Sequence, residues 1–299
     1  MLDNRYNSIK NIWKSLNRIC SYKNQQNFTN IKKLKTNQGL LTNSHQIADE
    51  FNNYFASVGN QLASNISPIP DGFKSYLTNH YANSMFLEPV THHEVFNAIL
   101  SLNNSKSSGQ DGITSKCLKI SVNCIINPLV LIINKSFFQG IFPSQFKTAK
   151  VIPIHKKGSF DSTQNYRPIS LLSNISKIFE KLMHSRIYKF LTKHNLLYSN
   201  QFGFRKGRST IDALITSINM VLTEKGCKNH VIGLFYDLSK AFDTVDHNIL
   251  LYKLNYYGIR GVVYQWFKSY LCERYQYVSV NNTCSTTLPT NIGVPQGQS

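Results

Sequence analysis

The sequence of 299 residues has few acidic side chains: 15 Asp and Glu stand against 33 Lys and Arg, for a formal net charge of +18. A surplus of this size predicts attraction to a polyanion, because each phosphate that a protein neutralises releases a condensed counterion. Charge alone leaves a second interpretation open, a basic protein without a specific partner. Motifs must decide between the two.

The six cysteines are scattered, without the C-x-x-C spacing of zinc sites and without a Cys/His cluster. Neither a zinc site nor a disulfide framework is indicated, and reduced thiols are expected. The N-terminal MLDNRYNSIK lacks the apolar core of a signal peptide, and no apolar run approaches the roughly 20 residues that cross a bilayer. We therefore expect an intracellular protein, in the nucleus or the cytoplasm, without a membrane partner.

Apolar residues make up 41% of the chain, enough for a buried core. Residues 1–40 are basic with a sparse helical stripe, and an amphipathic helix is predicted from Ile47 to Leu62. The segment SPIPDG (67–72) breaks this helix, so we place a boundary near residue 85. The chain is thus divided into a basic helical connector over 1–85 and a larger domain over 86–299.

The larger domain mixes helices and strands. Helices are predicted from the capping box at Thr91 to Leu102, after Ser173, and from the capping box at Ser209 to Gly226. Further elements are expected as an apolar helical region over 118–138, a strand over 148–154, helices over 246–257 and 261–272, and strands over 275–280 and 285–292. Because there is no regular βαβ alternation and no repeat, the predicted fold class is α+β.

The run VIGLFYDL (231–238) is continuously apolar and ends near an acid, as a buried central strand does. Enzymes that join nucleotides use two divalent cations, and Mg²⁺ prefers hard oxygen ligands. The Asp237 carboxylate and the Leu238 carbonyl are two such ligands at the end of the expected strand. A strand-terminal Asp is more commonly a turn former or a cap, so the pattern alone leaves both roles open.

The longer segment FYDLSKAFDTVDHNIL (235–250) resembles the first catalytic motif of reverse transcriptases from jockey-like non-LTR retrotransposons. The resemblance implies that Asp237 binds the catalytic metal, with the Leu238 carbonyl as a second ligand. It also implies that Phe242 rejects a 2′-hydroxyl by steric clash, which selects deoxynucleotides. Asp243 and Asp246 are interpreted as structural, capping the helix that follows.

The segment AKVIPIHKKG…NYRPISLL (149–172) is similar to the fingers hairpin of the same family. The resemblance puts Lys156 and Arg167 where basic side chains meet the incoming triphosphate. Arg167 lies between an aromatic residue and a proline and is predicted to be held in place. Lys157 is interpreted as solvated surface charge.

Two further blocks carry the resemblance. QFGFRKGRSTIDAL (201–214) is similar to the block near the template strand, and either Phe202 or Phe204 is expected to stack on a base or to belong to the core. Phosphate contacts to the template are expected from Arg205, Lys206 and Arg208. GVPQG (293–297) matches the turn that opens the second palm motif, which implies that Gln296 lies beside the nucleotide.

The four blocks follow the family's order over roughly 150–297, with weaker similarity over 85–149 and 1–85. The resemblance implies a right-hand polymerase with fingers and partial palm, helix-rich, with a small, incomplete and mostly antiparallel palm sheet. It implies catalysis of RNA-directed DNA synthesis by two Mg²⁺ or Mn²⁺ ions. The implied partners are an RNA template, a DNA primer and deoxynucleoside triphosphates.

The sequence departs from the family after GVPQG, where Gln298 and Ser299 stand in place of the expected serine and apolar-glycine-proline turn. The aromatic-x-Asp-Asp hairpin that supplies the other metal carboxylates, the thumb and an upstream endonuclease are absent from residues 1–299. We therefore expect a fragment that is inactive alone because its metal site is incomplete. A non-catalytic nucleic-acid-binding remnant and a decayed copy stay open as alternatives. Among related polymerases, the sequence DLSKAFDTVDH favours the non-LTR class over a group II intron maturase.

Overall fold

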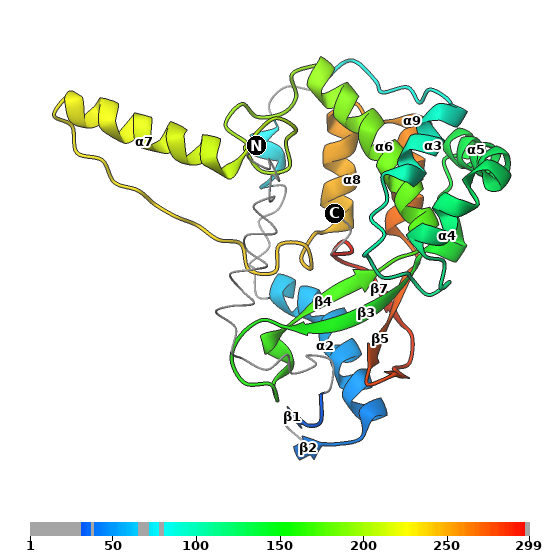
Figure 1. Cartoon of the computed structure of the whole chain (residues 1–299). Coiled ribbons are helices and arrows are strands. Elements are labelled where there is room, and N and C mark those ends of the chain that lie inside the picture. Colours follow the sequence, from blue (N-terminus) through cyan, green and yellow to red (C-terminus); the bar gives the residue numbers. More distant parts are fainter. Residues whose placement is uncertain (1–30, 37–38, 65–71, 78–80, 297–299) are drawn as a thin grey trace, which may run out of the picture.

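The computed structural model describes residues 31–36, 39–64, 72–77 and 81–296. A group of helices lies above one small twisted sheet, a single long helix crosses the sheet from the other side, and one helical arm projects away from both (Figure 1). The helical stripe expected between residues 9 and 19 lies outside the described residues.

The sheet joins segments from two distant parts of the chain, residues 148–171 and residues 274–290. Its strand order is β4 (Tyr166–Leu171), β3 (Thr148–His155), β5 (Arg274–Val280) and β6 (Thr283–Cys284), with β7 (Leu288–Thr290) also paired to β5. The β3–β5 pairing is parallel and the other pairings of this sheet are antiparallel. The strands predicted over 148–154 and 275–280 are confirmed, whereas the one expected over 285–292 is reduced to three residues.

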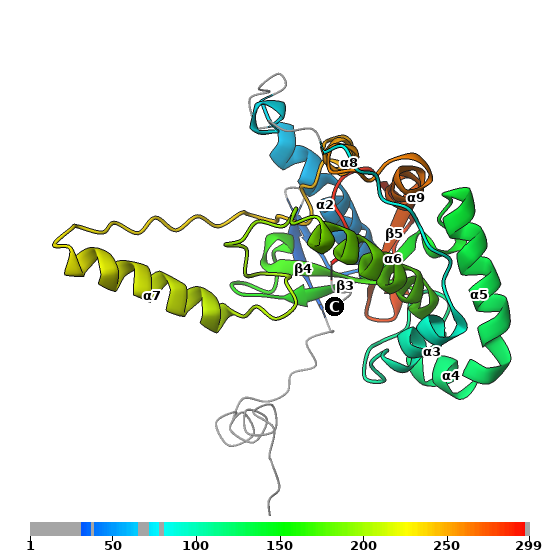
Figure 2. The ribbon, with the colours of Figure 1, turned by 90° about the horizontal axis from the view of Figure 1, so that it is seen from above.

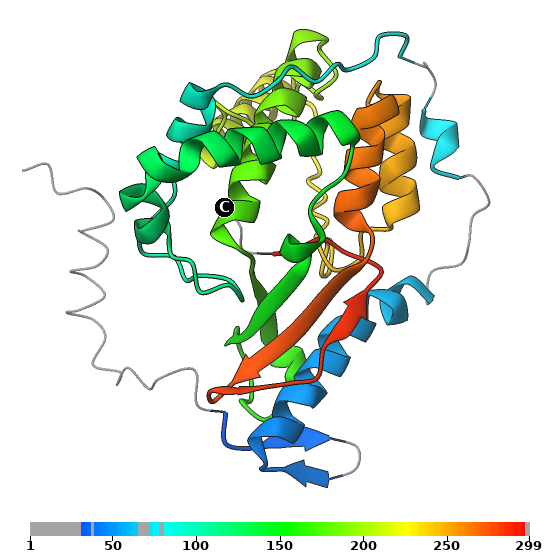
Figure 3. The same ribbon diagram turned by 90° about the vertical axis from the view of Figure 1, so that its right-hand side faces the viewer.

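The long helix α2 (Ser44–Ser64) confirms the predicted amphipathic helix and crosses one face of the sheet (Figure 3). Its Phe51 is fully buried and packs edge-on against Tyr166 of β4, with ring centroids 4.9 Å apart. A small hairpin, β1 (Leu34–Thr36) with β2 (Gly39–Leu41), lies at the same end. Described residues between Ile31 and Phe55 therefore share one hydrophobic cluster with the sheet, while the domain boundary near residue 85 stays a prediction.

A second hydrophobic cluster holds the helical group together around Phe142, Phe179 and Trp266. Its helices are α3 (His92–Leu100), α4 (Ser115–Ile120), α5 (Val122–Gln139), α6 (Asn174–Lys193), α8 (His247–Tyr256) and α9 (Gly261–Leu271). The described residues also include the 3₁₀ turns η1 (Lys74–Tyr76), η2 (Ser144–Phe146) and η3 (Thr163–Asn165). By length and composition α5 could also cross a membrane, with a mean hydropathy of 1.2 over 18 residues. One such helix is weak evidence, and α5 contributes Ile133 and Phe137 to the core.

Local sequence signals set the helix ends. The capping boxes at Thr91 and at Ser209 are both formed, and the Ser173 hydroxyl accepts a hydrogen bond from the Ile175 amide at the start of α6. Gly140 ends α5 in the left-handed conformation, with φ of 67°. These predictions are confirmed because a cap depends on only a few neighbouring residues.

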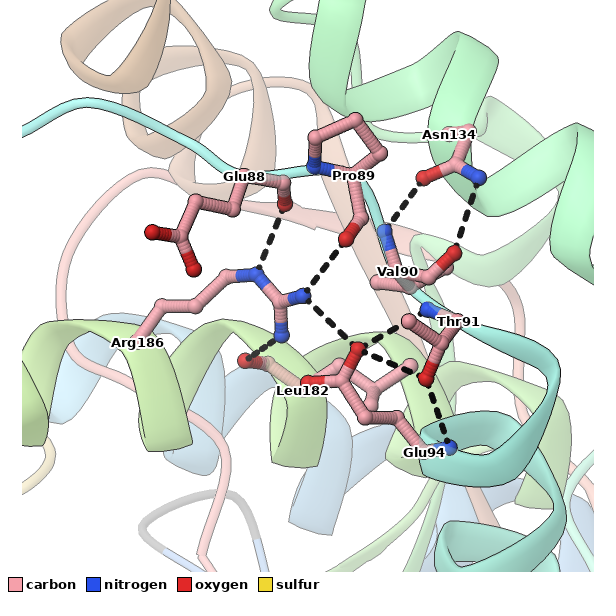
Figure 4. Close-up of polar contacts among 8 residues, drawn as sticks. All are labelled: Glu88, Pro89, Val90, Thr91, Glu94, Asn134, Leu182 and Arg186. Carbon is pink, nitrogen blue, oxygen red and sulfur yellow. Dashed lines mark hydrogen bonds and ion pairs between the residues drawn. The ribbon is translucent and has the colours of Figure 1, made fainter.

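Arg186 of α6 ties the segment before α3 to the helical group (Figure 4). Its guanidinium donates hydrogen bonds to the carbonyls of Glu88 and Pro89, at 3.1 and 3.2 Å, and pairs with Glu94 at 3.1 Å. Asn134 of α5 binds the backbone of Val90 from the other side. The segment before α3 is thus fixed to α5 and α6 by polar contacts.

The prediction of a buried strand over 231–238 is wrong. Residues 229–238 run extended without a ladder partner in the described part of the chain, beside α7 (Thr210–Gly226), and the two form the arm that projects in Figures 1 and 2. Phe235 is 98% exposed and Ile232 is 84% exposed. A continuous apolar run becomes a buried strand only where tertiary structure provides a neighbouring strand and covering helices, and the arm lies away from both clusters.

Candidate active site

The GVPQG turn joins three of the sequence blocks. The side-chain amide of Gln296 donates a hydrogen bond of 2.7 Å to the Asp243 carboxylate, and the Val294 amide donates one of 2.8 Å to the Phe242 carbonyl. The Ser170 amide of β4 donates to the Gln296 carbonyl at 3.0 Å. We call this meeting point of β4, residues 242–245 and residues 293–296 the junction.

Helix α2 packs against the junction at Gly59. A Cβ atom at Gly59 would lie 2.2 Å from the Asp243 carbonyl oxygen and 2.7 Å from a methyl group of Ile292. Such distances do not occur between real atoms, so only glycine permits this approach. The N-terminal helix thus supports the turn that carries Phe242 and Asp243.

A cavity of about 50 Å³ lies inside the junction, between Asp243, Gln296 and Arg274. Burial raises the pKa of Asp243, while the hydrogen bond from Gln296 and the charge of Lys240 lower it. Arg274 is 4% exposed, and its Nη2 has no hydrogen-bond partner within the described residues. The cavity has room for water-sized molecules, whereas ligand pockets are typically hundreds of Å³.

Phe242 connects the junction to residues 201–214, which we call the template-like block. It is 45% exposed and meets the ring of Phe204 edge-on, with centroids 6.3 Å apart. Phe204 is 88% exposed, so it is not a core residue. The aromatic residues of two blocks therefore lie side by side at the surface.

Asp237 and Leu238 lie on the exposed extended segment that leads to Phe242. Within the described ranges no group of three His, Cys, Asp or Glu side chains is close enough to hold a metal ion. Asp237 therefore has no gathered set of carboxylates around it in this part of the chain. Its role as a metal ligand stays a prediction.

The two acids that follow differ in their contacts. Asp246 caps α8, since its carboxylate accepts hydrogen bonds from the amides of Asn248 and Ile249 at 2.8 and 2.9 Å. The cap predicted for Asp246 is confirmed. Asp243 makes a structural contact, as predicted, but it does not cap α8. The Asp243 side chain faces Gln296 because the neighbouring Phe242 carbonyl is bonded to the Val294 amide of the GVPQG turn.

The basic residues expected at the nucleotide and template lie at the surface. Lys156 and Arg167 belong to the β3–β4 hairpin, where Arg167 faces Ile154 in the register. The expectation that Arg167 is held in place is wrong for its side chain, which is exposed and has no polar partner in the described ranges, because it points outward from an edge strand. Both side chains are free to reach a ligand.

The template-like block holds its cations differently. Arg205 donates a hydrogen bond of 2.8 Å to the Tyr198 carbonyl, and the Arg208 guanidinium lies 5.4 Å from the Phe202 ring centroid. The Lys206 side chain is exposed just before the N-terminus of α7. Cation–π contact and backbone bonding orient the two arginines, and their template role stays a prediction.

Sequence reasoning missed Gly59, Ser170 and Arg274. The alternation of RYQYVSV could have pointed to Arg274, because Arg274, Gln276 and Val278 occupy the inward positions of β5. Nothing local marks Gly59 or Ser170, since their importance comes from segments more than 100 residues away.

Comparison with known proteins defines the class first. Residues 154–299 match the family described as "Reverse transcriptase (RNA-dependent DNA polymerase)", and they belong to that family. The matched range contains the junction and each site residue named above except Gly59. The chain therefore carries a reverse transcriptase domain.

The relatives narrow the class to mobile elements. The chain is 36% identical over 221 residues to the "Probable RNA-directed DNA polymerase from transposon BS" of Drosophila melanogaster, covering 72% of this chain and 24% of the relative. It is 34% identical over 225 residues to the "RNA-directed DNA polymerase from mobile element jockey" of the same species, covering 75% and 24%. It is 25% identical over 209 residues to the "Transposon TX1 uncharacterized 149 kDa protein" of Xenopus laevis, covering 70% and 16%. The chain spans about a quarter of the length of the first two relatives.

Proposed function

We propose that this chain forms the nucleotide-binding and template-binding part of an RNA-directed DNA polymerase of a mobile element. The observation that carries the proposal is the junction, where blocks separated by more than 50 residues are joined by hydrogen bonds. A junction of this kind would bring Phe242 and Gln296 to the same nucleotide. The β3–β4 hairpin would be part of the fingers, and the junction part of the palm.

Exposed basic side chains could bind both the incoming nucleotide and the RNA template. Lys156 and Arg167 on the hairpin would bind the triphosphate of a deoxynucleotide, with the arginine able to form a bidentate contact. Arg205, Lys206 and Arg208 would bind phosphates of the RNA template beside the DNA primer. Phe242 would exclude the 2′-hydroxyl of a ribonucleotide.

Mg²⁺ or Mn²⁺ would complete such a site with hard oxygen ligands. Asp237 and the Leu238 carbonyl offer two of them, but the described residues do not by themselves fit a two-metal centre. Asp243 is bonded to Gln296, and its pKa is raised by burial, which disfavours the charged form that a metal needs. Further carboxylates would have to come from outside the described part of the chain.

A non-catalytic nucleic-acid-binding module is the second candidate, favoured because no group of three His, Cys, Asp or Glu side chains gathers to hold a metal within the described ranges. Primer extension with Mg²⁺ or Mn²⁺ tests the two, comparing residues 1–299 with a longer form that includes an aromatic-x-Asp-Asp hairpin. We expect both forms to bind a primer–template and only the longer form to extend it. Absence of primer–template binding would contradict the polymerase proposal.

The matched control is Asp237→Ala in both forms. It should abolish extension by the longer form and leave primer–template binding unchanged, since an exposed carboxylate repels phosphate rather than binding it. Extension by residues 1–299 that disappears in Asp237→Ala would show that these residues complete a metal site.

A further inference from the structure

Helices α8 and α9 form a hairpin with a groove between them. The two helices lie side by side in Figures 1 and 3 and contact each other. The groove encloses about 450 Å³ and is lined by Asn248, Tyr252, Asn255, Tyr256, Tyr264 and Lys268. Its size falls within the range of ligand sites.

The groove presents aromatic rings in fixed positions. Buried Leu251 also lines it, and Tyr252 is 44% exposed. The Tyr252 ring meets Phe73 edge-on at 5.4 Å, and the Lys74 ammonium lies 5.3 Å from its centroid. The Lys74 ammonium occupies one face of this ring, so a planar ligand would stack on the opposite face.

Four polar residues of the groove have no hydrogen-bond or ion-pair partner for their side chains within the described residues. The side-chain amides of Asn248 and Asn255 and the hydroxyl of Tyr264 make no hydrogen bond there, and Lys268 makes no ion pair. Amide side chains carry both donors and acceptors, which match the edges of nucleobases. The groove thus offers stacking surfaces together with unused hydrogen-bonding groups.

The charge of the hairpin selects an anionic ligand. Helices α8 and α9 contain no Asp or Glu, while Lys253 and Lys268 are basic. The flanking acids are Glu273 and Asp246, whose carboxylate is bound to the amides of Asn248 and Ile249 as the cap of α8. Lys268 lies in the groove itself and Lys253 is exposed beside it. Tyrosines interleaved with cations and without acids are the combination by which proteins bind single-stranded nucleic acid.

We propose that the α8–α9 groove binds single-stranded nucleic acid, with a base stacked on Tyr252 or Tyr264 and a phosphate near Lys268. This contact is additional to the junction and to the template-like block, and it does not depend on a metal ion. It would hold a strand on the helical group while the junction holds the nucleotide.

The test is binding of a short single-stranded RNA carrying 4-thiouridine to the whole chain, followed by photo-cross-linking and mapping of the cross-linked peptides. Moderate salt is used, because it weakens phosphate contacts elsewhere more than stacking. We expect cross-links within residues 247–268. We also expect Tyr252→Leu and Tyr264→Leu each to weaken binding by about fivefold or more, as removal of a stacked base contact does.

Conservative and distant variants separate stacking from a folding defect. Tyr252→Phe keeps the ring and should bind normally, and Lys268→Gln should weaken binding and reduce its salt dependence. Phe86→Leu, at a ring that is 86% exposed, and Lys135→Gln on α5 serve as matched controls and should bind normally.

Cross-links confined to other segments, with unchanged affinity in the groove variants, would overturn the proposal and leave the polymerase proposal intact. Equal weakening by the groove variants and by the control variants would also overturn it. If the unmodified chain did not bind a primer–template at all, that result would count against the polymerase proposal.

Discussion

The Gln296 amide and the Asp243 carboxylate lie 2.7 Å apart although 53 residues separate them in the sequence. The bond fastens the GVPQG turn to the residue that follows Phe242. It also occupies the side chain expected to contact a nucleotide, so nucleotide binding at this position has to compete with Asp243. The bond therefore stabilises the turn and also limits the access of a nucleotide to the Gln296 side chain.

Removing the side-chain amide of Gln296 should change the pKa of Asp243. In Gln296→Leu the pKa of Asp243 should rise further, because burial raises it and the bond from Gln296 lowers it. Stability at neutral pH should fall by about 1–3 kcal/mol, the usual cost of leaving a buried polar group unpaired. Urea unfolding measures the stability and carboxyl NMR titration the pKa, with exposed Gln265→Leu as control. An unchanged pKa would show that the bond does not form in solution.

Gly59→Ala should displace α2 from the junction. The added methyl group would overlap the Asp243 carbonyl and Ile292, and overpacking of this kind costs about 1–3 kcal/mol. Gly226→Ala is the matched control, because a Cβ there meets nothing within 4 Å at the end of α7. The control should be neutral or slightly stabilising, by up to about 1 kcal/mol. Equal stability of the two variants in thermal unfolding would contradict the packing described here.

Stability should decrease as pH rises because of Glu180. Burial raises the pKa of Glu180 from an ordinary value of 4.5 to about 7, despite opposing contacts with Ser176, Arg274, Tyr270 and Lys177. An acid with a raised pKa contributes its full share of stability below pH 4.5 and loses it as pH rises through about 7. The loss is on the order of 3 kcal/mol.

The corresponding variant removes this pH dependence. Glu180→Gln should flatten the profile of unfolding free energy between pH 5 and 8 and should exceed the unmodified chain in stability at the upper end. Glu88→Gln, at an exposed acid, should leave the profile unchanged. A Glu180→Gln profile as steep as that of the unmodified chain would show that Glu180 is not the group that titrates.

The cations of the β3–β4 hairpin should distinguish triphosphate from RNA. Replacing Lys156 and Arg167 with Gln should weaken binding of a deoxynucleoside triphosphate more than binding of RNA, because many other cations bind the RNA backbone. RNA affinity itself should fall by about a thousandfold or more between low and physiological salt if six or more phosphates are bound. Lys116→Gln with Lys135→Gln is the control of equal charge. The assignment would be contradicted if both double variants, the hairpin pair and the control pair, lost equal affinity for the triphosphate and for RNA. RNA binding that does not depend on salt would also contradict it.

The sequence by itself determined the positions of several helices and the caps at which three of them begin. The capping boxes at Thr91 and Ser209, the cap at Ser173 and the apolar stripe of α2 appear as predicted, because each depends on residues within about one turn of each other or on helical periodicity. The family was also readable from the order of four motifs, since motif spacing is a property of the chain alone.

Only the tertiary structure decided which side chains meet. Asp243 and Asp246 are both acids just before α8, yet one caps the helix and the other binds Gln296. The apolar run over 231–238 reads as a buried strand, yet it lies exposed beside α7. Burial and hydrogen-bond choice depend on neighbours supplied by distant segments such as β4, α2 and the GVPQG turn. Because local sequence does not encode those neighbours, the junction and the groove between α8 and α9 became visible only in the folded chain.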